Sequence, residues 1–286
     1  MRLARTCRLM NVTRQAIYQY EKRRQQRCEA LAPVKQMVLE VRCHLPRLGT
    51  RKLYHLLKPQ IQAAGIKLGR DGLFDYLRQH HLLIRPKRSY TKTTFSKHWM
   101  KKYPNLFKEM VVEHPEQVFV SDITYVESEE GVHYLSLVTD ACSRKIMGHE
   151  VSREMKATDV VKALQEAMKH RHSDTPLVHH SDRGIQYCSQ VYQAELAVHG
   201  ANASMTDGYD CYQNALAERV NGILKQEFLI YRCQTYEDLK TLVGESIEAY
   251  NRLRPHLSLG MKTPEEVHKK TSCVTQLASL KPVNVF

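Results

Sequence analysis

The strongest structural signal in the chain is the run Gln117-Val118-Phe119-Val120-Ser121-Asp122-Ile123-Thr124-Tyr125-Val126. Its β-branched and aromatic residues predict a β-strand, and the acidic segment 127–131 predicts the turn that ends it. Two more strand patterns follow at 133–140 and 145–151. Because short turns join the three, this region predicts an antiparallel meander whose first strand carries an acidic side chain, Asp122.

Helical and strand patterns alternate beyond this meander. The expected elements are, in order, a helix over 160–170, a strand over 176–180, a helix over 192–198, a strand over 202–205, and helices over 215–231 and 236–250. The order β-β-β-α-β-α-β-α is that of the RNase H-like fold. We therefore expect residues 117–268 to form an α/β domain, with a mixed five-stranded sheet flanked by helices.

The chain upstream of these strands predicts all-α structure in two units. The first, 1–30, has the layout of a helix-turn-helix, with Thr13 as the N-cap of a helix that would enter the major groove. A generic two-helix hairpin with a solvated basic face is the alternative. The second unit, 31–84, includes a helix that starts after Gly49. The residues expected to contact DNA in these units are Arg14, Gln15, Arg51 and Lys52.

Residues 85–116 predict a basic linker between the helical part and the domain with the strands. Arg85, Lys87 and Arg88 precede several aromatic residues. Basic and aromatic side chains together suit neutralisation of a phosphate backbone and stacking of bases. A tether that only spaces two domains is the alternative. Residues 269–286 are expected to form a C-terminal tail.

Charge divides the chain unevenly. Residues 1–110 hold 25 Lys and Arg against 6 Asp and Glu, whereas residues 111–286 hold 18 against 24. The basic part predicts binding to a polyanion such as double-stranded DNA, and the acidic part would repel that DNA unless metal cations neutralise its carboxylates. No apolar run approaches the roughly 18 residues of a membrane span. The N-terminus also lacks the apolar core of a signal peptide.

The 8 cysteines include no Cys-x-x-Cys pair, so we expect free thiols in a reducing compartment and no zinc site. Together with the absence of membrane or secretion signals, this predicts a cytoplasmic protein associated with the nucleoid and without a membrane partner.

Three acidic residues are placed where this fold would bring them together. Asp122 lies in the first strand, Asp182 directly follows the fourth, and Glu218 lies in the first turns of a helix that begins near Asn214. Each alone could be a turn or cap residue. Converging carboxylates, however, suit two divalent ions that activate a water or a 3′-OH and stabilise the leaving oxygen of a phosphodiester. Mg²⁺ prefers such oxygen ligands, and we expect Mn²⁺ to be able to replace it.

Four sequence blocks, in order, resemble the catalytic core of the IS3 family of insertion-sequence transposases. The family belongs to the DDE class, which is related to retroviral integrases. The blocks begin with Val120-Ser121-Asp122-Ile123-Thr124-Tyr125, His180-Ser181-Asp182-Arg183-Gly184-Ile185-Gln186-Tyr187, Asn214-Ala215-Leu216-Ala217-Glu218-Arg219 and Tyr250-Asn251-Arg252-Leu253-Arg254-Pro255-His256. The 35 residues between Asp182 and Glu218 also match the family's spacing. One departure is Phe119, where the family often has Trp.

The resemblance implies roles for individual residues. Asp122, Asp182 and Glu218 would be the metal ligands and catalytic residues, Lys225 would contact the end of the element, and Asn214 would orient the site. Two further positions stay open. His180 is either an acid–base group or part of a packed strand end, and Arg254 either contacts phosphate or holds the last helix against the core.

These features predict a transposase that binds the terminal repeats of its element and catalyses metal-dependent strand cleavage and strand transfer. Such an enzyme would hydrolyse one strand to expose a 3′-OH, which then attacks another phosphodiester. A homo-oligomer is expected, and a partner or fused segment from an upstream reading frame is expected for full end recognition. The alternatives are a DNA-binding regulator with an inert catalytic fold and a nuclease that cleaves without joining.

Overall fold

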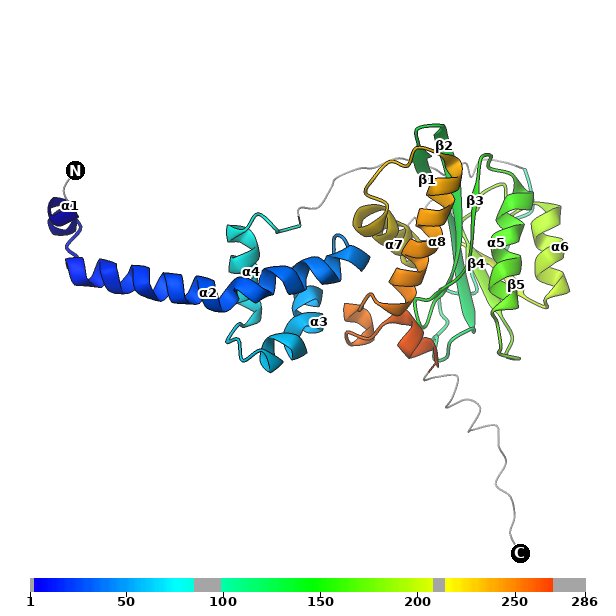
Figure 1. Ribbon diagram of the computed structural model, residues 1–286. Helices are drawn as coiled ribbons and strands as arrows, with labels where there is room; N and C mark the ends of the chain where they lie inside the picture. The colour runs from blue at the N-terminus through cyan, green and yellow to red at the C-terminus, as the bar shows by residue number, and fades with distance from the viewer. Residues whose placement is uncertain (1–2, 85–98, 208–213, 270–286) are drawn as a thin grey trace, which may run out of the picture. The chain divides into compact units, whose positions relative to one another are not determined.

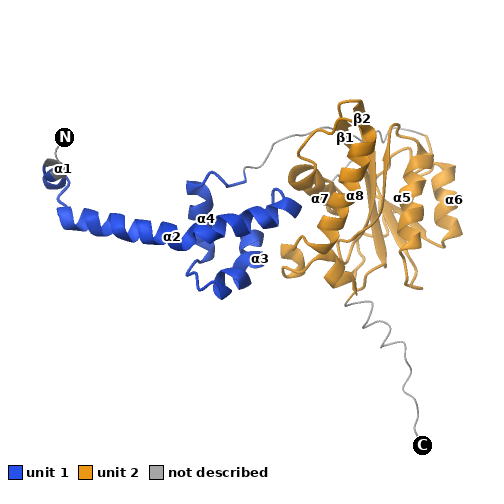
Figure 2. Ribbon diagram, viewed as in Figure 1, with its two compact units in different colours: residues 1–84 blue, residues 85–286 orange. Residues whose placement is uncertain are grey.

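The computed structural model describes residues 3–84, 99–207 and 214–269 (Figure 1). The chain divides into two compact units, residues 1–84 and 85–286, and each is considered by itself (Figure 2). Within the described residues, every helix is too short or too polar to cross a membrane.

The first unit is entirely helical. Its elements are α1 (Leu3–Leu9), α2 (Arg14–His44), α3 (Thr50–Ala63) and α4 (Arg70–Gln79). The Thr13 side chain accepts a hydrogen bond from the Ala16 backbone N–H at 3.1 Å, as the N-cap prediction requires. The core is built from one apolar stripe on each of the last three helices. It includes Val34, Val38, Leu53, Leu57, Leu73 and Leu77.

The predicted boundary at residue 30 falls inside α2, which runs unbroken for 31 residues. The segment around it offers no glycine, and Pro33 is accommodated within the helix. The buried residues of α2 all lie in its second half, so the first half of this helix does not form a core of its own. Arg14 and Gln15 are exposed at the start of α2.

The second unit confirms the predicted mixed sheet. Its strands are β1 (Val118–Ser128), β2 (Gly131–Asp140), β3 (Ile146–Ser152), β4 (Val178–Ser181) and β5 (Asn202–Met205), in the spatial order β3-β2-β1-β4-β5. β1, β2 and β3 are antiparallel, whereas β4 and β5 run parallel to β1. This arrangement is the RNase H-like topology.

Helices cover both faces of the sheet (Figure 1). α5 (Ala157–Lys169) and α6 (Gln190–Val198) lie on one side, and α7 (Ala215–Ile223) and α8 (Tyr236–Arg252) lie on the other. α5 lies very close to β3, because a Cβ added to Gly148 would lie 2.2 Å from the Ala163 carbonyl oxygen. The helix predicted over 215–231 changes character at Leu224, where a π-helical turn (Leu224–Phe228) replaces the α-helix. A short 3₁₀ turn (Leu257–Leu259) follows α8.

The later part of the predicted linker packs onto this second unit. The Leu106 N–H donates to Ser204 Oγ at 2.9 Å, and the Phe107 ring lies 5.2 Å from the ring of His180. Part of the segment 99–116 therefore forms an outer layer of the sheet unit and is more than a spacer. Arg85, Lys87 and Arg88 lie outside the described residues.

Candidate active site

Asp122 sits in the middle of β1, on the strand face that α7 covers. Its Oδ2 accepts a hydrogen bond from Asn221 Nδ2 at 2.7 Å, and its Oδ1 accepts one from the Ile123 N–H at 2.9 Å. Burial and then the negative charge of Asp182 raise the pKa of Asp122 from 3.8 to about 7, against the lowering effect of these two hydrogen bonds.

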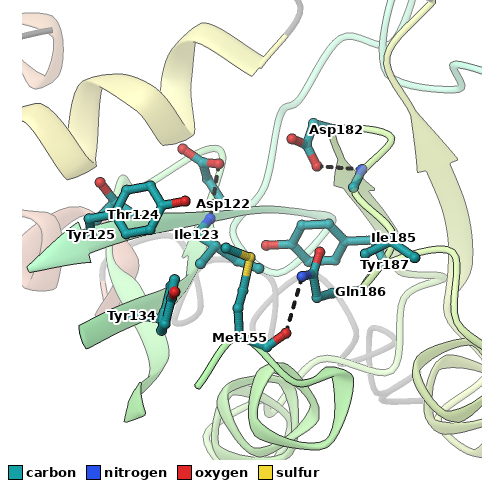
Figure 3. A pocket seen from close by; sticks show the side chains of 11 residues that line it. Asp122, Ile123, Thr124, Tyr125, Tyr134, Met155, Asp182, Ile185, Gln186 and Tyr187 are labelled. Atoms are coloured by element: carbon teal, nitrogen blue, oxygen red, sulfur yellow. Dashed lines mark hydrogen bonds between the residues drawn. The ribbon is translucent and has the colours of Figure 1, made fainter. Parts of the chain in front are cut away.

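Asp182 reaches the same place from the neighbouring strand. β4 pairs with β1 in parallel, with His180 opposite Val120, so the chain leaves β4 beside Asp122. The Gly184 N–H donates to Asp182 Oδ1 at 2.9 Å and fixes the turn that follows the strand. Both aspartates line one pocket, Asp122 from β1 and Asp182 from the loop that follows β4 (Figure 3). The predicted pairing of these two acids is present in the structure.

Glu218 occupies the first turn of α7 but does not line that pocket. Its side chain is exposed, and its pKa is raised by partial burial and by the charge of Asp182. Among residues 3–84, 99–207 and 214–269, no three His, Cys, Asp or Glu side chains stand close enough to hold one metal ion together. The structure therefore brings two of the predicted acids together and places the third nearby.

Asn221 is a site residue that the sequence reasoning missed. It follows Glu218 by three residues on α7, and it is only 5% exposed. Side chains at this spacing share a helix face, so the signal was present in the sequence. Asn214, which was predicted to orient the site, donates from Nδ2 to the Ser121 carbonyl oxygen at 3.0 Å and so holds the start of α7 against β1.

Lys225 lies in the π-helical turn that continues α7. Its Nζ donates to Thr124 Oγ1 at 3.2 Å, two residues beyond Asp122 on the same strand face. π-Helical turns often occur at functional sites. Desolvation lowers the pKa of Lys225, and the negative charges of Glu127 and then Asp122 oppose this shift.

His180 and Arg254 are buried structural groups. His180 is fully buried, and its Nδ1 hydrogen-bonds with Ser204 Oγ at 2.9 Å. Arg254 is 1% exposed and donates to both carboxylate oxygens of Glu227, at 2.6 and 2.9 Å. These contacts favour the packed strand end for His180. For Arg254 they favour an anchor between α8 and the π-helical turn.

The remaining predicted DNA contacts lie in the helical unit. Arg51 is exposed in the first turn of α3, and Lys52 is half-buried there. Neither belongs to the unit that carries the carboxylates.

The donor set fits a hard divalent cation. Every candidate ligand atom is an oxygen, as Mg²⁺ prefers. Asn221 Oδ1 is buried without a hydrogen-bond partner in the described part of the chain, which leaves one more oxygen beside Asp122. A cation between Asp122 and Asp182 would offset the repulsion that raises the pKa of Asp122.

Comparison with known proteins identifies the family of the chain. Two integrase core domain models match residues 112–211 and 199–264. The IS3A transposase InsF of Escherichia coli (strain K12) is 29% identical over 276 residues, 92% of this chain and 93% of the relative. The transposase for insertion sequence element IS629 of Shigella sonnei is 32% identical over 227 residues, 77% of this chain and 73% of the relative. The chain belongs to the IS3 family of insertion-sequence transposases.

Another relative of this IS3-family transposase is the uncharacterized 31 kDa protein of insertion element IS600 from Shigella sonnei. It is 33% identical over 237 residues, 81% of this chain and 87% of that protein. Among solved structures, the HTLV-2 integrase catalytic core domain in complex with magnesium covers 54% of this chain at 19% identity, with a TM-score of 0.44. As a member of the family, the chain is a DDE polynucleotidyl transferase that acts on DNA with divalent metal ions.

Proposed function

We propose that Asp122, Asp182 and Glu218 hold two Mg²⁺ ions, and that this transposase uses them to cut the ends of its own insertion sequence and join them to target DNA. The observation that carries the proposal is the pairing of Asp122 with Asp182. Two carboxylates carried by parallel strands share one pocket, and burial together with the charge of Asp182 raises the pKa of Asp122 to about 7. Mn²⁺ is expected to substitute for Mg²⁺.

Glu218 completes the set in this proposal. It lies on the same helix as Asn221, which already contacts Asp122, and its charge interacts with both aspartates. Exposed side chains change rotamer freely on the nanosecond scale, so a bound cation can recruit this carboxylate without a change of fold.

The residues of the site divide the work of phosphodiester chemistry. Divalent ions, when bound, stabilise charge on the attacking and leaving oxygens. Asn221 holds Asp122 in place, the Gly184 N–H holds Asp182, and Lys225 offers a positive charge to the DNA backbone. The first reaction is hydrolysis of one strand, which frees a 3′-OH. In the second, that hydroxyl attacks a phosphodiester of the target and displaces a 3′-oxygen.

End recognition is assigned to the basic helical unit. Arg14, Gln15 and Arg51 are exposed on its helices, where they can reach phosphates or bases. Because two element ends must be cut and joined together, we expect the transposase to act as a homo-oligomer on DNA. A segment from an upstream reading frame is expected to assist binding of the ends.

The decisive experiment is Asp182→Asn, with Asp174→Asn as the matched control, because Asp174 is an exposed acid of the same unit. The assay measures cleavage and strand transfer of duplexes that carry the element's terminal repeats, in Mg²⁺ and in Mn²⁺. We expect Asp182→Asn to abolish both products and to bind the duplex as wild type does, and Asp174→Asn to be fully active. Normal strand transfer by Asp182→Asn would overturn the proposal.

The same assay separates the two alternatives. Pre-cleaved ends that are joined to target DNA exclude a nuclease without joining activity. Binding of the duplex by wild type without any cleavage in either metal would indicate a regulator with an inert catalytic fold.

A further inference from the structure

The pocket that Asp122 and Asp182 line extends well past the two carboxylates. Its volume is about 160 Å³, and it passes between β1 and the loop after β4. Figure 3 shows the aspartates at one end and Tyr134 and Met155 on the far side of β1. The residues that line this extension are Ile123, Tyr125, Tyr134, Met155, Ile185 and Tyr187. The proposed metal ions account for the carboxylate end alone, so the extension is free to bind something else.

The hydroxyl of Tyr187 is the first sign that the extension has a ligand. The residue is 2% exposed, and its hydroxyl oxygen is buried without a hydrogen-bond partner in the described part of the chain. In Figure 3 its ring reaches from the Asp182 loop toward Ile123. A neighbouring tyrosine behaves differently, because the Tyr192 hydroxyl hydrogen-bonds with His179 Nε2 at 2.9 Å. A buried hydroxyl without a partner costs free energy, so its retention in this wall indicates a partner that arrives with the substrate.

Two further tyrosines give the extension an aromatic wall. Tyr125 and Tyr134 are cross-strand partners on β1 and β2, and their ring centroids lie 5.2 Å apart. Both are half-buried, so each keeps part of its ring open to the pocket. Aromatic rings of this kind are the usual stacking surface for unpaired bases.

The opposite wall is held in place by a hydrogen bond. Gln186 Nε2 donates to the Met155 carbonyl oxygen at 3.2 Å, which ties the Asp182 loop to the segment after β3. The extension is therefore a fixed cavity between two tied segments, and its size can select a ligand.

We propose that this extension binds one unstacked pyrimidine base next to the phosphodiester that is cut, with Tyr125 and Tyr134 against its ring and the Tyr187 hydroxyl bonded to its polar edge. The inference rests on the proposed function, because it takes the strand at the carboxylates as given. The whole pocket, its carboxylate end included, measures about 160 Å³, and a cavity of roughly 150 Å³ holds a single six-membered ring such as benzene. A pyrimidine has one such ring, whereas the second ring of a purine exceeds the space. The tyrosines thus determine which base can stand beside the cut.

The first test locates the base without measuring activity. Duplexes of the element's end, taken from the DNA that flanks the gene, carry 5-iododeoxyuridine at successive positions around the cleavage point. The full-length transposase binds them in Ca²⁺ and is irradiated, and the crosslinked peptides are identified by mass spectrometry. We expect one position beside the cut to crosslink to Tyr125 or Tyr134. Crosslinks that avoid both tyrosines at every position would overturn the inference.

The second test removes only the Tyr187 hydroxyl. Tyr187→Phe is compared with Tyr192→Phe on cleavage substrates with a pyrimidine, a purine or an abasic site at that position. Wild type should prefer the pyrimidine, and Tyr187→Phe should lose roughly tenfold of this preference while its melting temperature holds or rises, because it loses a hydroxyl without a partner. Tyr192→Phe should melt lower and keep the preference. An unchanged preference in Tyr187→Phe would contradict the inference.

The outcomes distinguish this inference from the proposed function. If cleavage needs Asp182 but does not depend on the neighbouring base, the inferred base pocket is refuted and the proposed carboxylate site stands. Crosslinking to the tyrosines without cleavage in any metal would support the pocket and refute the proposed chemistry.

Discussion

Replacing Asn221 with alanine removes the 2.7 Å hydrogen bond that its Nδ2 donates to Asp122 Oδ2. This bond lowers the pKa of Asp122, whereas burial and the charge of Asp182 raise it. The resulting pKa is about 7. A divalent cation binds the ionised carboxylate, so its affinity should rise with pH, with a midpoint near pH 7, and level off once Asp122 has lost its proton. Asn221→Ala should move that plateau to higher pH.

The expected size follows from the type of bond. A buried hydrogen bond to a charged group contributes about 1.5–3 kcal/mol, and 1.36 kcal/mol corresponds to one pKa unit. The midpoint should therefore shift up by about one to two units. At neutral pH the cation should bind roughly tenfold more weakly, which is within the range found when a residue that supports a metal ligand is lost.

The folded-state pKa of Asp122 lies above its ordinary value of 3.8, so the folded metal-free chain holds an extra proton between these two pH values. Stability without metal should thus fall as pH rises through this window, and Asn221→Ala should extend the fall to higher pH. Addition of the cation should reverse the loss.

The assay is Mn²⁺ binding by calorimetry from pH 6 to pH 9, with the melting temperature measured in parallel. Asn214→Ala is the matched control, because Asn214 lies on the same helix face and bonds to the backbone of β1 instead of to the carboxylate. It should melt lower without a shift of the binding midpoint. The reasoning is refuted if Asn221→Ala keeps the wild-type midpoint, or if Asn214→Ala shifts it equally.

Other substitutions test the fold and the DNA contact. Gly148→Ala should cost at least about 2 kcal/mol of unfolding free energy in urea, because its Cβ would meet the backbone of α5, whereas Gly244→Ala has open space and should gain about 1 kcal/mol. Arg254→Met should lower the unfolding free energy by about 3 kcal/mol by leaving its carboxylate partner unpaired, against under about 1 kcal/mol for Arg252→Ala, whose ion pair is exposed. Equal losses for the last pair would contradict the structural role given to Arg254. Lys225→Ala should weaken binding to element-end duplexes and reduce the slope of log K against log salt by about 1, and an unchanged slope would remove Lys225 from the DNA contact.

Most of the catalytic fold could be predicted from local pattern. The three antiparallel strands carry β-branched residues and the helices carry apolar stripes, so the order of the elements could be predicted before any contact was known. The residue at which α7 ends could not be predicted in this way. The α-helix changes to a π-helical turn at Leu224, and no residue type at that position signals the change.

The length of α2 was also not predicted from the sequence pattern. Two apolar stripes separated by a polar stretch look like two helices, but no glycine lies between them and Pro33 is accommodated, so a single helix continues through residue 30. The packing of the later part of the predicted linker could not be predicted from local sequence either. Its contacts with Ser204 and His180 join residues about a hundred and about seventy positions apart.

The sequence by itself determined the identity and spacing of Asp122, Asp182 and Glu218, because phosphodiester chemistry with hard cations needs carboxylates and the fold order puts them near one another. Tertiary structure alone decided how close each one comes. Parallel pairing of β1 and β4 brings the two aspartates into one pocket, while Glu218 stays exposed on α7. It also revealed Asn221 and the unpartnered hydroxyl of Tyr187, because burial and hydrogen bonding are properties of the packed chain.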